Sequence, residues 1–101
     1  MYDMANLKKL KTVKELAPET FAAFQAFDAA AMKDGAIPVK YKELIAIAVA
    51  MTTQCPYCIE IHAKKAKQAG CTEAEIAEAT LVAAALRAGA AVTHATHAIG
   101  L

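Results

Sequence analysis

Apolar residues recur at helical spacing along this 101-residue chain, and no stretch alternates polar and apolar residues with the period of two expected of a half-buried strand. One helical series consists of Phe21, Phe24, Phe27 and Ala31. Residues three and four apart lie on one face of a helix, so we expect this series to face the core. The sequence therefore predicts an all-α fold.

Proline and glycine mark the bounds of the first two long helices. Pro18 and Pro38 each suit the first turn of a helix, where a missing N–H leaves no hydrogen bond unmade. Gly35 suits a left-handed C-terminal cap for the helix that begins at Pro18. The helix that begins at Pro38 is expected to end near residue 52, and its apolar run 44–51 predicts burial on all sides.

A polar break at Thr52-Thr53-Gln54 separates this helix from a third one, which runs from about Pro56 to Ala69. Gly70 suits the end of the third helix. Because the break is short, we expect the two helices to pack as an antiparallel hairpin at the centre of the fold.

A fourth long helix begins at Thr72 and Glu75, which have capping-box spacing. Gly89 is expected to bend or divide this helix before residues 92–99. The residues expected to point inward are Ile76, Ala79, Val82, Ala83 and Leu86. The Ala-rich part 79–92 has a longer apolar face than a monomer can hide, so we expect a stable homo-oligomer.

The chain shows no linker, repeat or low-complexity segment, and its length suits one modest core. Leu7 and Leu10 lie on a short first helix or arm. The sequence therefore predicts one domain over residues 1–101, a single-domain helical bundle of about five helices with a central antiparallel helix hairpin.

Charge and hydropathy exclude several classes of partner. The net charge is +1, from 11 Lys and Arg against 10 Asp and Glu, so no nucleic-acid partner is indicated. The longest strictly apolar run, 44–51, is too short to span a membrane, and Arg87 interrupts the apolar segment 81–92. The start of the chain carries Asp3 and Lys9 and lacks the apolar stretch of a secretory signal. We therefore expect a cytoplasmic protein.

The segment Cys55-Pro56-Tyr57-Cys58 is the strongest chemical signal in the sequence. It lies at the expected N-terminus of the third helix, where unpaired N–H groups and the helix dipole stabilise a thiolate and lower its pKa. Two cysteines three apart can close a disulfide, so one can attack a substrate and the other resolve the product. The total of three cysteines is odd, which fits a disulfide-stapled secreted domain poorly. Cys71 is expected to be a bystander in a turn.

Two further residues fit a proton relay to this pair. His62 follows Cys58 by four residues, so both share a helix face, and the imidazole is expected to take the thiol proton and favour the anion. Glu43 lies on the buried helix, and in an antiparallel hairpin it comes within about one turn of His62. A carboxylate in that apolar setting needs a partner. The predicted order of the relay is Glu43, His62, Cys58.

A zinc module is an alternative interpretation of the same residues. Cys55, Cys58 and His62 would be three ligands, and His94 or His97 would supply the fourth that a structural zinc site requires. The spacing from Cys58 to His62 is awkward for a closed chelate on one helix. We therefore favour redox chemistry of the cysteine pair over the zinc module.

Glu43, Cys55, Cys58 and His62 together form the pattern E-x11-C-x2-C-x3-H. This pattern resembles the signature of the alkyl hydroperoxidase D-like (AhpD-like) family, within the carboxymuconolactone decarboxylase superfamily, and the resemblance covers about residues 18–97. It implies an AhpD-like helical fold that assembles into hexamers or trimers. It also implies a thiol-dependent peroxidase or disulfide reductase with an antioxidant role and no cofactor.

The resemblance also implies a role for each residue. Cys58 would attack a hydroperoxide and become a sulfenic acid, and Cys55 would condense with it to form a disulfide. His62 and Glu43 would relay the proton, and a dithiol such as a dihydrolipoyl protein would be the reductant. Tyr57 stands where the best-known peroxidase members carry a histidine, so this chain lacks one candidate proton donor. The decarboxylase branch of the superfamily, which acts on a lactone acid without needing the cysteine pair, is the alternative activity.

Overall fold

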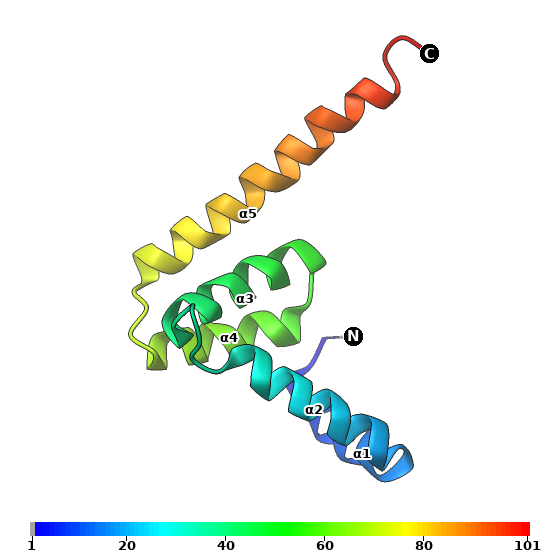
Figure 1. The fold of residues 1–101 in the computed structure, drawn as a ribbon, viewed down its shortest axis with the longest axis vertical. Coiled ribbons are helices and arrows are strands. Elements are labelled where there is room, and N and C mark those ends of the chain that lie inside the picture. The colour runs from blue at the N-terminus through cyan, green and yellow to red at the C-terminus, as the bar shows by residue number, and fades with distance from the viewer. Residues whose placement is uncertain (1) are drawn as a thin grey trace.

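The structure is a computed structural model that describes residues 2–101, and it contains no strand among those residues. Two short 3-10 helices, η1 (Met4–Lys9) and η2 (Ala95–His97), lie near the two ends. The five α-helices are α1 (Leu10–Leu16), α2 (Pro18–Met32), α3 (Val39–Thr53), α4 (Pro56–Gln68) and α5 (Glu73–His94). The predicted all-α fold of about five helices is confirmed (Figure 1).

Helices α3 and α4 form the predicted antiparallel hairpin, and α5 packs against α3 (Figure 1). Gln54 makes the turn with a left-handed φ of 58°, and the N–H of Cys55 donates back to the last turn of α3. The break is shorter than predicted. Thr52 and Thr53 stay in α3, where their hydroxyls donate to the carbonyl of Val49 in the same helix.

Most of the predicted helix starts are present. Pro18 occupies the first turn of α2. At the start of α5, the N–H of Glu75 donates to the Thr72 hydroxyl at 3.1 Å, and the N–H of Thr72 donates to the Glu75 carboxylate at 2.8 Å. This is the complete capping box that the sequence predicts. Gly70, with a φ of 91°, follows the end of α4 as expected.

Gly35 does not form the predicted left-handed cap of α2, because that helix already ends at Met32. The ammonium group of Lys42 donates to the carbonyls of Ala31 and Lys33 at 2.8 and 2.6 Å. These bonds satisfy carbonyls at the end of α2 from a neighbouring helix, so no glycine is required there.

Helix α5 continues through Gly89, contrary to the predicted bend. The space beside Gly89 is open, so the glycine is not required by the close approach of another part of the chain. Figure 1 shows the second half of α5 projecting beyond the hairpin. Of its predicted inward residues, Ala83 is buried, but Val82 and Leu86 are exposed, Leu86 at 68%.

The core of this chain is small and centres on the hairpin. Ile47 of α3 and Ala66 of α4 are fully buried, and Cys71 completes the buried cluster. Leu44, Met51 and Ile76 pack against it. The outer face of α3 is open, with Ile45 and Val49 about half exposed, so the predicted burial of α3 on all sides is wrong for a single chain.

The phenylalanine series of α2 does not face the core as predicted. Phe24 is exposed, and Phe27 is 73% exposed. The reason is that α2 packs mainly on α1, in a second hairpin that lies to one side of α3 and α4 (Figure 1). The radius of gyration is 16.9 Å, whereas a compact domain of this length has about 13 Å. A single chain is therefore an extended body with much apolar surface uncovered.

The segment Glu73–His97 consists of α5 and η2 together. By length and composition it is apolar enough to cross a membrane. The sequence predicts no such segment from its uninterrupted apolar runs, but a long helix can be apolar on average although Arg87 interrupts it. One helix of this kind is a weak indication of a membrane span. A helix that packs against another protein surface has the same composition.

Candidate active site

The hairpin brings Glu43 of α3 and His62 of α4 into direct contact. The Oε2 atom of Glu43 lies 2.7 Å from Nδ1 of His62, and Glu43 is only 4% exposed. The two residues meet because α3 and α4 run antiparallel from the turn at Gln54. A buried carboxylate without a partner would be costly, so His62 stabilises Glu43 inside the fold.

This contact determines which nitrogen of His62 can transfer a proton. An ionised carboxylate only accepts hydrogen bonds, so Nδ1 carries the proton that it shares with Glu43. Nε2 is then the ring nitrogen that can accept a proton and return it. A base oriented in this way by a third group is the arrangement that activates a nucleophile.

The two cysteines of the motif lie at the start of α4 with their sulfurs 2.7 Å apart. Cys55 is the N-cap residue, and its sulfur accepts a hydrogen bond from the backbone N–H of Cys58 at 3.3 Å. The two thiols are hydrogen-bonded to each other, and once Cys55 is ionised the thiol of Cys58 is the donor to its sulfur. Both residues are free, partly buried thiols.

This geometry shifts the pKa values of the two thiols in opposite directions. The hydrogen bond from the Cys58 thiol, supported by backbone N–H groups of α4, lowers the pKa of Cys55. The same hydrogen bond, together with burial, raises the pKa of Cys58 to about 11. The pKa of Cys58 in the reduced pair is thus raised rather than lowered, and the effect predicted for His62 on this thiol stays a prediction. A thiol that donates its proton to a neighbouring sulfur holds that proton more tightly.

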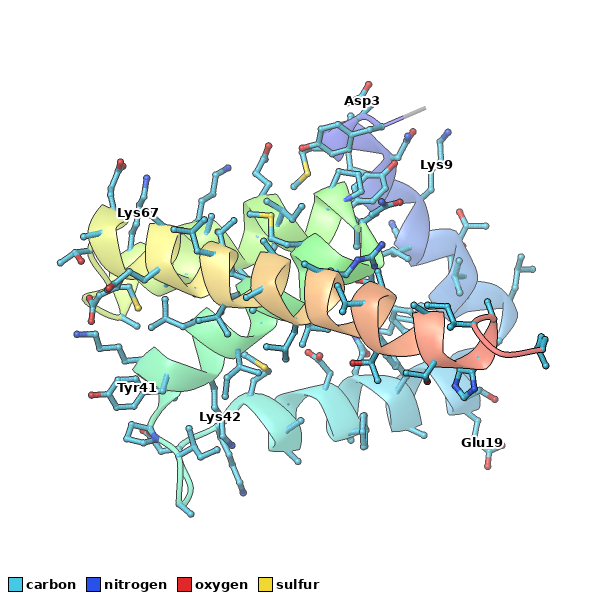
Figure 2. The ribbon with its side chains drawn as sticks, turned by 90° about the horizontal axis from the view of Figure 1, so that it is seen from above. Asp3, Lys9, Glu19, Tyr41, Lys42 and Lys67 are labelled. Atoms are coloured by element: carbon cyan, nitrogen blue, oxygen red, sulfur yellow. The ribbon has the colours of Figure 1, made fainter. Side chains whose placement is uncertain are left out.

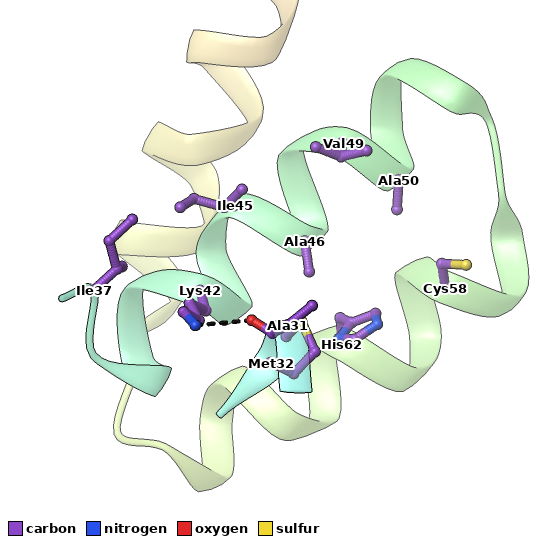
Figure 3. Close-up of a pocket in the computed structure, with 10 residues that line it drawn as sticks. All are labelled: Ala31, Met32, Ile37, Lys42, Ile45, Ala46, Val49, Ala50, Cys58 and His62. Atoms are coloured by element: carbon purple, nitrogen blue, oxygen red, sulfur yellow. Dashed lines mark hydrogen bonds between the residues drawn. The ribbon is translucent and has the colours of Figure 1, made fainter. Parts of the chain in front are cut away.

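An apolar cavity of about 420 Å³ opens beside Cys58 and His62 (Figure 3). Figure 3 shows Ala46 and Ala50 on α3 pointing toward His62 and Cys58 on α4, and these small side chains leave space between the helices. The cavity is lined by Ala31, Met32, Ile37, Lys42, Ile45, Ala46, Val49, Ala50, Cys58 and His62. Cys58 and His62 thus line the same cavity, and in the view of Figure 3 the sulfur of Cys58 points away from the ring of His62.

Sequence reasoning missed this cavity. Ala31 and Met32 reach it from the end of α2. Residue spacing within one helix does not predict which other helix passes beside it. The signal that could have indicated it is the pair Ala46 and Ala50, four residues apart in the apolar run 44–51. Small residues at that spacing lie on one helix face and leave room beside it.

The remaining cysteine and histidines lie apart from the site. Cys71 is buried in the core, where its thiol donates to the carbonyl of Lys40 at 3.4 Å and burial raises its pKa. His94 and His97 stack with ring centroids 5.3 Å apart, at the projecting end of α5. Among residues 2–101, no three His, Cys, Asp or Glu side chains gather closely enough to hold a metal ion. The zinc alternative therefore lacks its ligand set in the described part of the chain.

Comparison with known sequences gives a family match over most of the chain. The sequence profile of the carboxymuconolactone decarboxylase family matches residues 18–99. An uncharacterized protein of Paracoccus denitrificans, protein 4 in the cox locus, is 49% identical over 79 residues, which span 78% of this chain and 71% of the relative.

Solved structures share the fold. A protein from Methanobacterium thermoautotrophicum has a TM-score of 0.80 at 38% identity, over 84% of this chain and 96% of that one. A second structure is a carboxymuconolactone decarboxylase family protein from Thermotoga maritima, for which involvement in an antioxidative response has been suggested. It has a TM-score of 0.65 at 26% identity, over 92% of this chain and 85% of that one.

Proposed function

Because the chain belongs to the carboxymuconolactone decarboxylase family, which includes AhpD-like proteins, we propose that it is a thiol-dependent alkylhydroperoxidase and disulfide reductase with an antioxidant role. One observation carries the proposal. Two thiols have their sulfurs 2.7 Å apart, and one of them, Cys58, lines an apolar cavity together with His62, which is paired with Glu43. A nucleophile, an oriented base and a substrate cavity are the parts that such a reaction requires.

In the first step, Cys58 attacks a hydroperoxide held in the cavity. The high pKa of Cys58 makes a base necessary, and Nε2 of His62 takes the thiol proton. The sulfur bonds to the terminal peroxide oxygen as the O–O bond breaks. The leaving alkoxide takes the proton back from His62 and departs as an alcohol, and Cys58 becomes a sulfenic acid. Glu43 stabilises the imidazolium between the two transfers.

In the second step, the Cys55 thiolate attacks the sulfenic sulfur of Cys58. The hydroxyl group leaves as water with the proton that the Cys55 thiol released on ionising, and a Cys55–Cys58 disulfide forms. A dithiol reductant, for which the family suggests a dihydrolipoyl protein, returns two electrons and two protons by thiol–disulfide exchange. The cytoplasm keeps such dithiols reduced, and we propose it as the location of this protein.

One equivalent of hydroperoxide is expected to convert Cys55 and Cys58 to a disulfide and to leave Cys71 open to alkylation after unfolding. The first two sulfurs lie 2.7 Å apart, whereas Cys71 is buried in the core with a raised pKa. Peptide mass spectrometry before and after the peroxide measures both states. A disulfide that includes Cys71, or the absence of any disulfide, would contradict the proposal.

We also propose that the protein works as a homohexamer, with a trimer as the alternative. Large apolar side chains are exposed on α2 and α5, among them Phe24, Phe27, Leu81, Leu86 and Val92. Monomers rarely expose such surface, and further copies of the same chain can cover it. Light scattering is expected to give about six times the chain mass of 10.6 kDa. The mass of a monomer at micromolar concentration would refute the assembly.

Decarboxylation of a lactone acid, the activity in the family's name, is the alternative function. According to the family resemblance, that reaction does not need the cysteine pair. Replacing Cys58 by serine would leave decarboxylation intact and abolish peroxide reduction, so one variant distinguishes the two activities.

A further inference from the structure

Residues 2–6 form an arm that lies against the start of α4, at the Cys-x-x-Cys motif (Figures 1 and 2). The ring of Tyr2 packs edge-on against the ring of Tyr57, with centroids 5.2 Å apart and planes at 71°. The side-chain amide of Asn6 donates to the Tyr57 hydroxyl at 3.2 Å. The Tyr2 hydroxyl donates to the carboxylate of Glu60 at 2.9 Å. The arm therefore holds Tyr57 at both its ring and its hydroxyl.

The arm has local order of its own. The carboxylate of Asp3 caps η1 by accepting from the N–H of Ala5 at 2.9 Å, and the carbonyl of Asp3 accepts from the N–H of Asn6 at 2.9 Å. Figure 2 shows Asp3 at the outer side of this turn. Tyr2 and Asn6 thus reach Tyr57 from a hydrogen-bonded turn.

Tyr57 connects the arm to the sulfur of Cys55 through its own backbone. The N–H groups of Tyr57 and Cys58, in the first turn of α4, both donate toward that sulfur. Tyr57 therefore contacts the arm through its side chain and the sulfur of Cys55 through its backbone N–H. Tyr57 is the position at which this sequence departs from the family resemblance, and no step described above uses its side chain.

We propose that Tyr2 and Asn6 are positioning residues of the thiol pair, which fix the side chain of Tyr57 and so hold the amides of α4 against the sulfur of Cys55. The inference rests on the proposed function and deepens it, because a Cys55 thiolate is the group that resolves the sulfenic acid. Release of the arm lets the first turn of α4 fray, as helix ends do where few contacts hold them. Fraying weakens the hydrogen bonds that favour the thiolate and makes the disulfide harder to reduce.

The test is the pH dependence of Cys55 alkylation in the full, reduced chain, with the modified cysteine located by fragmentation in a mass spectrometer. A variant with both Tyr2→Ala and Asn6→Ala is expected to raise the apparent Cys55 pKa by about one unit, the equivalent of one weakened hydrogen bond to a charged group. At a fixed pH below that pKa, alkylation then slows by up to about tenfold. Tyr57→Phe keeps the ring and loses the hydroxyl, so it is expected to give a smaller shift in the same direction. Lys9→Ala, at an exposed position on η1, is the matched control and is expected to give none.

This readout separates positioning from structural support. An unchanged Cys55 profile in the double variant overturns the inference, even if its unfolding temperature falls. If the double variant does not fold, the profile of Tyr57→Phe decides in the same way. Alkylation requires no peroxide, so a shifted profile in a protein that does not reduce peroxides would sink the peroxidase proposal and leave the positioning of Cys55 intact.

Discussion

Replacement of Cys58 by serine is expected to lower peroxide turnover by a factor of about 10³ or more, because it removes the proposed nucleophile from a residue that lines the cavity. Serine keeps the size of the side chain and its place in the first turn of α4, but its hydroxyl is a far weaker nucleophile than a thiolate. Hydroperoxide loss in the presence of excess dithiol measures the rate. Cys71→Ala is the matched control, since it removes the cysteine outside the pair, and its rate is expected to stay near that of the unmodified chain.

A Cys55→Ser variant separates attack from resolution. Without the resolving thiol, the sulfenic acid on Cys58 is expected to persist after one turnover and to react with a dione trap. The Cys58→Ser variant is expected to give no such adduct. An adduct on Cys55 in Cys58→Ser, formed at the rate of the unmodified chain, would reverse the two roles. It would show that the thiol with the lower pKa is the one that attacks.

The features that the sequence predicts well depend on local rules. The capping box at Thr72 and Glu75 follows from two residue types at one spacing. The meeting of Glu43 and His62 requires only the position of the turn and the rise of a helix, which the chain order supplies. For that reason, the sequence predicts that Glu43 and His62 meet and that Cys55 and Cys58 lie together.

The features that the sequence mispredicts depend on what lies beyond one helix. Helical spacing marks Phe27 and Leu86 as apolar-face residues, but it does not say whether this chain or another covers them. Both are exposed because α2 and α5 project from the hairpin (Figure 1). The sequence does not predict the raised pKa of Cys58 either, for a different reason. It depends on which of two adjacent thiols donates to the other, and the spacing of Cys55 and Cys58 is the same in either case.

The second large effect expected concerns the relay. His62→Ala is expected to lower peroxide turnover by about 10²- to 10⁴-fold, the usual contribution of a positioned general base. Glu43→Gln is expected to lose less, because the amide oxygen still accepts from Nδ1 while the charge that favours the imidazolium is gone. The double variant is expected to be little worse than His62→Ala, since Glu43 acts only through His62. Single-turnover kinetics at saturating peroxide measure all three, and independent roles would instead multiply the two losses.

Urea unfolding of the same variants distinguishes a relay from a structural pair. His62→Ala leaves the carboxylate of Glu43, 4% exposed, without its partner, which costs about 1–3 kcal/mol of the free energy of unfolding. The double variant replaces that carboxylate by a neutral amide and is expected to regain part of the lost stability, while its turnover stays as low as that of His62→Ala. If the contact only supported the hairpin, turnover would recover together with stability. Recovered turnover in the double variant would therefore end the relay proposal and assign the contact between Glu43 and His62 to the packing of α3 on α4.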